Sequence, residues 1–561
     1  MASRRNQRTA AQVASALLAQ AESDESSATD SSSESEDGVD EAAVFSSESD
    51  EDDFSFSRSA HASTAFMSKL GKQWSAQPLH GTVGRPPSFN RPQNLSCPSR
   101  DAAIQGETVI GAFQIFLTNE ILDIIIRCTN EYGQQVIGQQ RMDTSRDVFL
   151  SFLGLLILAG VYRGRHEPII HLWNSENGRP IFSQTMSRNR FQSLCKCLRF
   201  DSRYDREQRR ERDKLAAIRD IHDKFAARCR AAYKPGINVC VDEQLVVFRG
   251  RCPFKVYIPS KPGKYGIKIW TCADVNTAYC SNFEVYCGRQ GHSPEIGQGS
   301  RVVMQMTSHL SGSGRGCRPT ADNFFSSDVL AEKLLQERLT FVGTVRQNKP
   351  FLPPAITSKA NKSVLSSTFA HREHLTLVSY IPKRGRNVVL ISSQHMDQEV
   401  HTDCQDKKPE IILHYNSTKG AVDSLDKLLR TYSTQRKTRR WPVALFYNFI
   451  DISAYNRFVI YKFNYPGFAN NQPQQRRLFL EQLGKNLVSD AIARRNPQST
   501  VVIPNPVVQE EISMPRKRAR CGLCPGPWDK KPKTVDICYK CSIHACKRHN
   551  TTVCIRCKQE L

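Results

Sequence analysis

The sequence lacks an apolar run long enough to cross a bilayer. Its longest run, Val148–Tyr162, has about 15 residues, whereas a spanning helix needs roughly 20. The N-terminus, MASRRNQRTAAQ, lacks the apolar core of a secretory signal. We therefore expect no membrane-spanning segment and no secretion, and we expect Val148–Tyr162 to be a buried helix.

Acidic residues are scarce outside one segment. Glu22–Asp53 holds 14 acids and no Lys or Arg, which leaves 41 acids against 78 Lys and Arg for the rest of the chain. The rest of the chain, here called the basic body, is therefore more basic than the overall net charge of +23 suggests. Such a body attracts nucleic acid in a salt-sensitive way. An anionic membrane surface is the weaker alternative, because no amphipathic basic helix stands out.

The first 108 residues are also poor in large apolar side chains, and we expect them to be a disordered acidic region followed by a linker. Ser31, Ser47 and Ser49 each have an acid three residues later, a pattern that acidophilic kinases read. Two roles are open for the acidic segment. It either competes with DNA for the basic body or serves as a solubilising tail.

Cysteine is abundant, and its spacing favours metal binding over a disulfide framework. Seven of the 19 cysteines lie in the last 41 residues, which is typical of a zinc-binding block in a reducing compartment. Four pairs with two intervening residues supply eight ligands, enough for two tetrahedral Zn²⁺ sites. The pairs are Cys521 and Cys524, Cys538 and Cys541, Cys546 and His549, and Cys554 and Cys557. Alternating pairs would cross-brace the block, and His544 is a spare ligand.

The zinc is expected to be structural, because every ligand position is filled and so few residues cannot bury a core. Spacing does not decide whether the block binds DNA, a protein or ubiquitin enzymes. Just before it, Arg516–Arg520 is a basic cluster that is similar to a nuclear localisation signal and could equally touch phosphates.

Periodicity divides the middle of the chain into a helical part and a part rich in strands. Helices are predicted at 112–129, 147–162, 187–198, 214–233, 327–339, 420–433, 441–463 and 478–494, and strands at 239–248, 266–273, 282–288, 339–345, 375–380 and 388–392. The highly charged stretch Asp201–Asp213 is expected to be a loop, and Pro350–Lys408 an inserted strand-rich unit.

Three acids occur in different structural contexts: Asp242 within a β-prone run, Asp322 before a helix, and Asp423 on a later helix. Two divalent cations serve many phosphodiester reactions, and Mg²⁺ is bound by a few carboxylates with water and phosphate. Convergence of these acids would make such a site. For Asp242 the alternative is a structural salt bridge with a nearby arginine, and the residues alone leave both readings open. Glu243 should point to the opposite face of the strand.

Five long motifs resemble the piggyBac family of DDE/D DNA transposases. They are VDEQLVVFRGRCPFKVYIPSKPGKYGIKIW, TADNFFSS, VGTVRQNK, YNSTKGAVDSLDKLLRTYSTQRKTRRWPVALFYN and the terminal CKRHNTTVCIRC. The resemblance runs in order from about Ile110 to the C-terminus. It implies an α/β fold with an RNase H-like catalytic core, in which Asp242, Asp322 and Asp423 bind Mg²⁺ and Asp426 is an adjoining fourth catalytic acid.

Composition, cysteine spacing and the resemblance together predict a division into domains. These are 1–108, the disordered acidic region and linker; 109–237 and 434–495, two parts of a helical DNA-binding and dimerisation domain; 238–349 and 409–433, two parts of the catalytic core; 350–408, a β-rich insertion; 496–520, a linker with the basic cluster; and 521–561, the zinc-binding domain. One departure is the polar stretch Arg315–Ala321, where the strand before Asp322 should be apolar.

The activity implied by the resemblance is cut-and-paste transposition in the nucleus by a homodimer acting on double-stranded DNA. The 3′ end of the transposon is nicked, the freed 3′-OH attacks the opposite strand to leave a hairpin, and the reopened end joins target DNA at TTAA. The basic residues after Asp242, namely Arg249, Arg251, Lys261 and Lys264, are candidates for binding DNA. Arg439 and Arg440 are candidates for a phosphate clamp. Trp441 is a candidate either for stacking on a base or for packing in a helix core.

Two other functions are kept open. One is a domesticated DNA-binding or chromatin protein that retains the fold without transposing. The other is a zinc-finger interaction module such as a ubiquitin ligase, which leaves the basic body and the four acids without a role.

Overall fold

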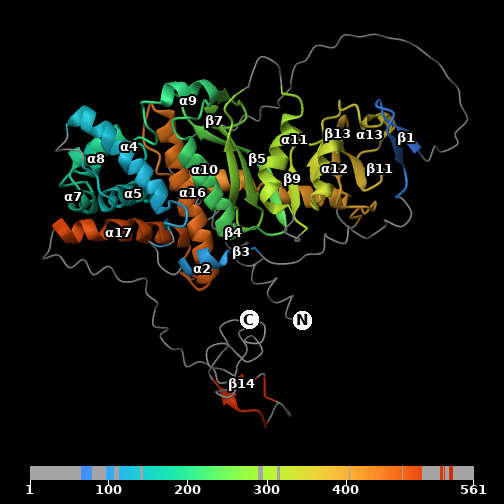
Figure 1. Cartoon of the computed structure of the whole chain (residues 1–561). Helices are drawn as coiled ribbons and strands as arrows, with labels where there is room; N and C mark the ends of the chain where they lie inside the picture. The colour runs from blue at the N-terminus through green and yellow to red at the C-terminus, as the bar shows by residue number, and fades with distance from the viewer. Residues whose placement is uncertain are drawn as a thin grey trace, which may run out of the picture. The chain divides into compact units, whose positions relative to one another are not determined.

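The computed structural model describes two units of the chain. In the unit that ends at Val501, it describes residues 65–78, 96–105, 111, 113–138, 143–288, 295–311, 316–402, 405–470 and 472–495. In the C-terminal unit it describes residues 519–521, 523–524 and 530–534. Figure 1 shows both units and labels many of their elements.

The first unit contains both helices and strands. Its described helices are α2 (Arg100–Gln105), α4 (Asn119–Ile137), α5 (Arg146–Val161), α6 (Ile169–Leu172), α7 (Pro180–Thr185), α8 (Arg188–Cys197), α9 (Arg206–Arg212), α10 (Arg219–Ala232), α11 (Gln298–Thr307), the 3-10 helix η3 (Ser308–Leu310), α12 (Asp328–Gln336), α13 (Pro354–Thr357), α14 (Glu410–Thr418), α15 (Ala421–Thr431), α16 (Trp441–Asn464) and α17 (Gln475–Arg495). Its described strands are β1 (Ala65–Met67), β2 (Gln73–Ser75), β3 (Cys97–Pro98), β4 (Tyr233–Lys234), β5 (Asn238–Val247), β6 (Lys255–Tyr257), β7 (Tyr265–Asp274), β8 (Cys280–Val285), β9 (Arg318–Ala321), β10 (Val342–Thr344), β11 (Ser367–Arg372), β12 (Leu375–Lys383) and β13 (Arg386–Ser392).

A mixed sheet organises the first unit. Its order is β1-β2-β11-β12-β13-β10-β9-β5-β7-β6, and β8 also pairs with β7. Strand β7 runs antiparallel to both of its neighbours β5 and β8, whereas β9 and β10 run parallel to β5. Both faces of β5 are buried, since Val239 and Val241 pack into one apolar cluster and Cys240 and Val246 into another. Burial on both faces explains why this strand reads as an apolar run rather than as a simple alternation.

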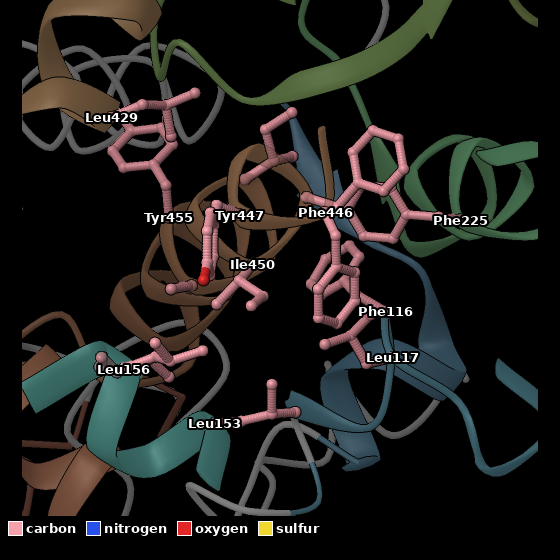
Figure 2. Packing of buried hydrophobic residues seen from close by; sticks show 14 of the residues in the cluster. Phe116, Leu117, Leu153, Leu156, Phe225, Leu429, Phe446, Tyr447, Ile450 and Tyr455 are labelled. Carbon is pink, nitrogen blue, oxygen red and sulfur yellow. The ribbon is translucent and has the colours of Figure 1, made fainter. Parts of the chain in front are cut away.

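Helices cover both faces of the central strands. Helix α10 packs against β8, α15 against β5 and β7, α16 against β5, and α11 against β7 and β8. Figure 1 labels α10, α11 and α16 around β5 and β7. The larger apolar cluster joins the first of these faces to the helical region. Figure 2 shows Leu153 and Leu156 of α5, Phe225 of α10 and Phe446 of α16 within it. The sheet and the helical region therefore share one apolar core.

The helix prediction at 147–162 is confirmed, because α5 is buried along almost all of its length. None of the described helices is both long enough and apolar enough to span a membrane. The expectation for Asp201–Asp213 is corrected, since this stretch contains the helix α9. Asp201 is buried and binds the guanidinium groups of Arg206 and Arg209, and this local charge pairing allows an arginine-rich segment to fold against the protein.

The predicted insertion at 350–408 extends the central sheet. Strand β13 pairs antiparallel with β10, with Val342 opposite Ser392, and β12 and β11 follow outward. The strands predicted at 375–380 and 388–392 are thus confirmed as β12 and β13. Strand periodicity predicted their existence, but it carried no information about which neighbour they would pair with.

Two segments of the region expected to be disordered are folded. The hairpin β1–β2 continues the sheet beyond β11, and the side chain of Trp74 is fully buried there. Lys72 Nζ lies 2.5 Å from Asp328 Oδ2, whose side chain is 4% exposed. Residues 96–105 form β3 and α2, and β3 pairs with β4. The buried ring of Trp74 and the ion pair of Lys72 thus attach residues 65–78 to the sheet, although composition alone assigns this segment to disorder.

The described part of the C-terminal unit is a small hairpin. Strands β14 (Ala519–Arg520) and β15 (Lys533–Thr534) pair antiparallel. Cys521 is buried and Cys524 is partly buried. The remaining predicted zinc ligands, Cys538, Cys541, Cys546, His549, Cys554 and Cys557, lie outside the described residues, as do the acidic segment and most of the basic cluster Arg516–Arg520.

Candidate active site

Asp242 and Asp322 follow the last paired residues of two parallel strands. In the β5–β9 ladder Cys240 is opposite Thr320 and Val241 is opposite Ala321. The next residue on each chain is an aspartate, and adjacent strands lie about 4.8 Å apart. The parallel register therefore brings both acids to the same end of the β5–β9 ladder, where β9 stops and β5 continues.

The polar stretch before Asp322 still forms a strand. Only four residues, Arg318–Ala321, pair in β9, and Pro319, Thr320 and Ala321 are buried. The backbone N–H of Phe324 donates to Asp322 Oδ1 at 2.9 Å, and the hydroxyl of Ser326 donates to the carbonyl of Asp322 at 2.8 Å. These bonds define the turn that ends the strand, so the register that the sequence left in doubt is resolved.

Asp423 reaches the site from α15, where its side chain is 65% exposed. Lys261 Nζ donates to Asp423 Oδ1 at 2.9 Å and to the carbonyl of Glu243 at 3.4 Å. Lys261 lies in the connection between β6 and β7. The lysine thus ties the helix that carries the third acid to the strand that carries the first.

The carboxyl groups repel one another electrostatically. Burial, with the negative charges of Glu243, Asp322 and Asp423, raises the pKa of Asp242 to about 8. Burial likewise raises the pKa of Asp322, and Glu243 adds to the shift. Such crowding of partly buried acids is the electrostatic condition that a bound cation relieves.

The donor set fits Mg²⁺, which prefers carboxylate oxygens and keeps several waters. Within the described ranges, no three His, Cys, Asp or Glu side chains gather closely enough to make a complete ligand set. Asp423 is instead held by the ammonium of Lys261. Asp242, Asp322 and Asp423 are the residues that would hold the ion.

Asp426 has different surroundings from the other three acids. It is 8% exposed, and its carboxylate accepts from Gln244 Nε2 at 3.3 Å and lies 2.7 Å from Arg430. Gln244 also donates to Asn448 Oδ1 of α16 at 3.2 Å. Asp426 therefore belongs to a buried polar network that joins β5, α15 and α16, next to the end of the β5–β9 ladder where the other acids lie.

Lys268 also lies at the site. From the sequence it was only one of several basic residues that follow Asp242. Its Nζ lies 3.9 Å from the ring centroid of Trp270 and 5.3 Å from that of Phe324. Burial lowers its pKa, whereas the charges of Glu243, Asp322 and Asp242 raise it. A lysine within the otherwise apolar strand GIKIW was the available signal.

The candidate DNA-binding residues divide into two groups. Arg251, Arg439, Arg440 and Trp441 line a pocket of about 740 Å³. Of its described lining residues nine are basic and none is acidic; the basic ones are Arg199, Arg203, Arg206, Arg210, Lys214, Arg251, Lys255, Arg439 and Arg440. Arg249 and Lys264 are exposed outside the pocket lining, and Lys261 binds Asp423.

The contacts of Arg440 give it a structural role. Its Nη1 donates to the carbonyl of Leu198 at 2.7 Å and its Nη2 to the carbonyl of Cys195, and burial lowers its pKa. Arg439 is exposed, which makes it the better phosphate ligand of the two. The ring of Trp441 packs edge-on against Phe254 at 5.0 Å while it lines the pocket, so both interpretations of this tryptophan stay open.

Comparison with known proteins identifies the family. A family model described as transposase IS4 matches residues 109–458. A solved piggyBac transposase synaptic complex with hairpin DNA has a chain that is similar with a TM-score of 0.67 and 33% identity, over 82% of this chain and 100% of that one. The chain belongs to the piggyBac family of IS4-type transposases.

Two human proteins are also related to this piggyBac-family chain. PiggyBac transposable element-derived protein 3 of Homo sapiens is 24% identical over 394 residues, which is 67% of this chain and 63% of that protein. The chimeric ERCC6-PGBD3 protein of Homo sapiens is 24% identical over 394 residues and is matched over 35% of its length. The chain thus spans less than two thirds of the length of either relative.

Proposed function

We propose that this piggyBac-family chain is a DNA transposase that cleaves and rejoins phosphodiester bonds. The observation that supports this best is the placement of Asp242 and Asp322 at the same end of the β5–β9 ladder, with Asp423 facing them from α15. The strand order β8-β7-β5-β9-β10, with three antiparallel and two parallel strands, is that of an RNase H-like core. A fold of this kind presents acids from distant parts of the chain to one phosphate.

Mg²⁺, when bound, would neutralise charge on the phosphate and favour both attack and departure of oxygen. In this chain Asp242, Asp322 and Asp423 would hold the ion, and the buried network around Asp426 would keep α15 in place. Lys268 would place a positive charge beside the acids. Lys261 would keep Asp423 near β5 before the site is loaded.

The substrate we propose is double-stranded DNA with the terminal repeats of a transposon, cut at its ends and joined to TTAA. The pocket with nine basic residues supports this, because phosphate contacts from Arg and Lys position a duplex. The solved relative is a synaptic complex with hairpin DNA. We extend the proposal to a homodimer that acts in the nucleus, with Arg516–Arg520 as the localisation signal and two structural Zn²⁺ ions in residues 521–561.

The test is excision of a marker flanked by the element's own terminal repeats. Asp242→Asn and Asp423→Asn should each abolish excision while the variants still bind duplex DNA. Loss of the carboxylate removes a candidate metal ligand with little change in side-chain shape. Normal excision by either variant would show that the active-site assignment is wrong.

A domesticated DNA-binding or chromatin protein is the second candidate. The human relative named piggyBac transposable element-derived protein 3 favours it. In that case the wild-type protein would bind duplex DNA and would excise nothing. The retained acids Asp242, Asp322, Asp423 and Asp426 favour the active enzyme.

A further inference from the structure

The hairpin formed by β6 and β7 exposes two aromatic rings on the side of β7 that leads away from the candidate active site. Tyr257 and Tyr265 lie directly opposite each other in the β6–β7 ladder. Their ring centroids are 4.8 Å apart with an interplanar angle of 44°. The residues are 54% and 45% exposed, respectively. A cross-strand pair that serves only to stabilise a hairpin gains most when it is buried, yet these rings leave about half of their surface to solvent.

This hairpin contacts the candidate active site through its turn. Lys261, in the turn between the two strands, contacts both Asp423 and the carbonyl of Glu243. Backbone bonds from Ile258 to Lys264, and from Lys264 to Lys261, order the turn. Pro259 and Pro262 restrict it further. The tyrosines are therefore held at a defined place relative to the acids.

The charge of the segment favours a polyanion. Residues 249–265 contain Arg249, Arg251, Lys255, Lys261 and Lys264, and no Asp or Glu. Lys255 Nζ lies 6.0 Å from the ring centroid of Tyr265. Exposed aromatic rings among cations are the means by which proteins bind unpaired nucleotides, since each base can stack on a ring and each phosphate is attracted to a cation.

The distance along β7 agrees with a nucleotide strand that leaves the acids. Thr271 is opposite Asp242 in the β5–β7 ladder, and Tyr265 is six residues earlier on the same strand. At the rise of a β-strand this is roughly 20 Å. A few unpaired nucleotides can cover that length, whereas the paired bases of a duplex have no exposed face to offer the rings.

We infer that Tyr257 and Tyr265 form a stacking platform for unpaired bases of the DNA strand, a few nucleotides away from the cleavage position. The inference rests on the proposed function and adds to it the part of the substrate that this hairpin binds. The rings stack on the bases, and Lys255 and Lys264 contact the adjoining phosphates.

The experiment compares two oligonucleotides at one salt concentration with the full chain. One is a blunt duplex and the other is the same duplex with a four-nucleotide single-stranded extension that contains 2-aminopurine. The wild-type protein should bind the extended duplex more tightly and quench the 2-aminopurine fluorescence. The double variant Tyr257→Ala/Tyr265→Ala should lose about tenfold in affinity for the extended duplex, lose the quenching, and bind the blunt duplex within about twofold of wild type.

Two control variants separate stacking from structure. Tyr257→Phe/Tyr265→Phe keeps both rings and should retain the preference and the quenching. Tyr465→Ala removes one ring of a pair with similar geometry, in which the centroids of Tyr461 and Tyr465 are 4.8 Å apart at 40°, at the far end of α16, and it should change neither reading.

The outcomes distinguish the stacking site from the proposed function. If the alanine double variant keeps the preference for the extended duplex, or loses affinity for both oligonucleotides equally, the platform is refuted while transposase function stands. If the wild-type protein binds neither oligonucleotide, the proposed function fails and the platform fails with it. Thermal melting of each variant confirms that it is folded.

Discussion

Asp423 and Asp426 lie one turn apart on α15 and have opposite surroundings. The side chain of Asp423 is 65% exposed and contacts the flexible side chain of Lys261. The residue Asp426 is 8% exposed and is engaged by Gln244 and Arg430. An exposed acid with one flexible partner can release that partner and bind a metal ion. A buried acid with several partners instead stabilises the fold. On the proposed function, this contrast predicts that Asp423 matters chiefly for the reaction and Asp426 chiefly for stability.

The largest expected effect is that of Asp423→Asn on excision. The variant should lose at least about 100-fold in rate, the upper range for loss of even an outer-shell partner of a metal. Its melting temperature should stay close to that of wild type, because surface ion pairs contribute little. Excision assays and calorimetry on the same preparations measure both. A large loss of stability would contradict the exposed position of Asp423.

The next effect reverses this pattern. Asp426→Asn should lower the free energy of unfolding by about 1–3 kcal/mol, since Arg430 loses its buried charged partner and the network with Gln244 is disrupted. Urea denaturation measures the change. Asp426→Glu, which keeps the charge but alters the reach, serves as the comparison. If Asp426→Asn is as stable as wild type and as inactive as Asp423→Asn, Asp426 belongs with the metal ligands and the contrast between the two acids fails.

A third acid extends the comparison to pH. Asp451 of α16 accepts from the Ser433 hydroxyl at 2.7 Å and from the Thr434 N–H at 2.8 Å, and burial raises its pKa to about 7. A carboxyl group with a raised folded-state pKa contributes stability at low pH that is lost as the pH rises toward that value. The free energy of unfolding should therefore fall, by up to roughly 1.4 kcal/mol per pH unit, between about pH 4 and pH 7.

Asp451→Asn should remove this dependence, because an amide does not titrate. Urea denaturation of wild type and variant at pH 5 and pH 7 isolates the contribution of this residue from that of all other groups. The variant should gain stability relative to wild type as the pH rises. Parallel pH dependences for the two proteins would show that Asp451 is ionised throughout.

The smallest expected effect concerns Lys261. Lys261→Met removes the ammonium that occupies Asp423, so Mn²⁺ should bind about twofold to fivefold more tightly, as expected for the loss of a weak competing ion pair. Titration calorimetry of the full chain measures this affinity. Lys264→Met, which removes a cation three residues away that is exposed, is the matched control. Weaker metal binding by Lys261→Met would show that the lysine organises Asp423 rather than competing for it.

Much of the fold could be predicted from the sequence, because helical and strand periodicity report which residues are buried within one element. The helices α5, α15 and α16 and the strands β5 and β7 follow from that pattern. The folded hairpin around Trp74 did not. Residues 65–78 contain four large apolar side chains (Phe66, Met67, Leu70 and Trp74) with no regular period, and the partners of the hairpin lie on α12 and β11. Pairing between distant segments leaves no periodic signal in either one.

By itself the sequence determined the chemistry that is present: a basic body, a cysteine block with metal-ligand spacing, and acids in motifs that resemble piggyBac transposases. Only the tertiary structure decided the position and surroundings of each residue. The β5–β9 register brought Asp242 and Asp322 to the same end of that ladder, and α15 left Asp423 exposed while burying Asp426. The physical reason is that residue type and local spacing are properties of the chain, whereas exposure, partners and electrostatic repulsion arise only when distant segments pack.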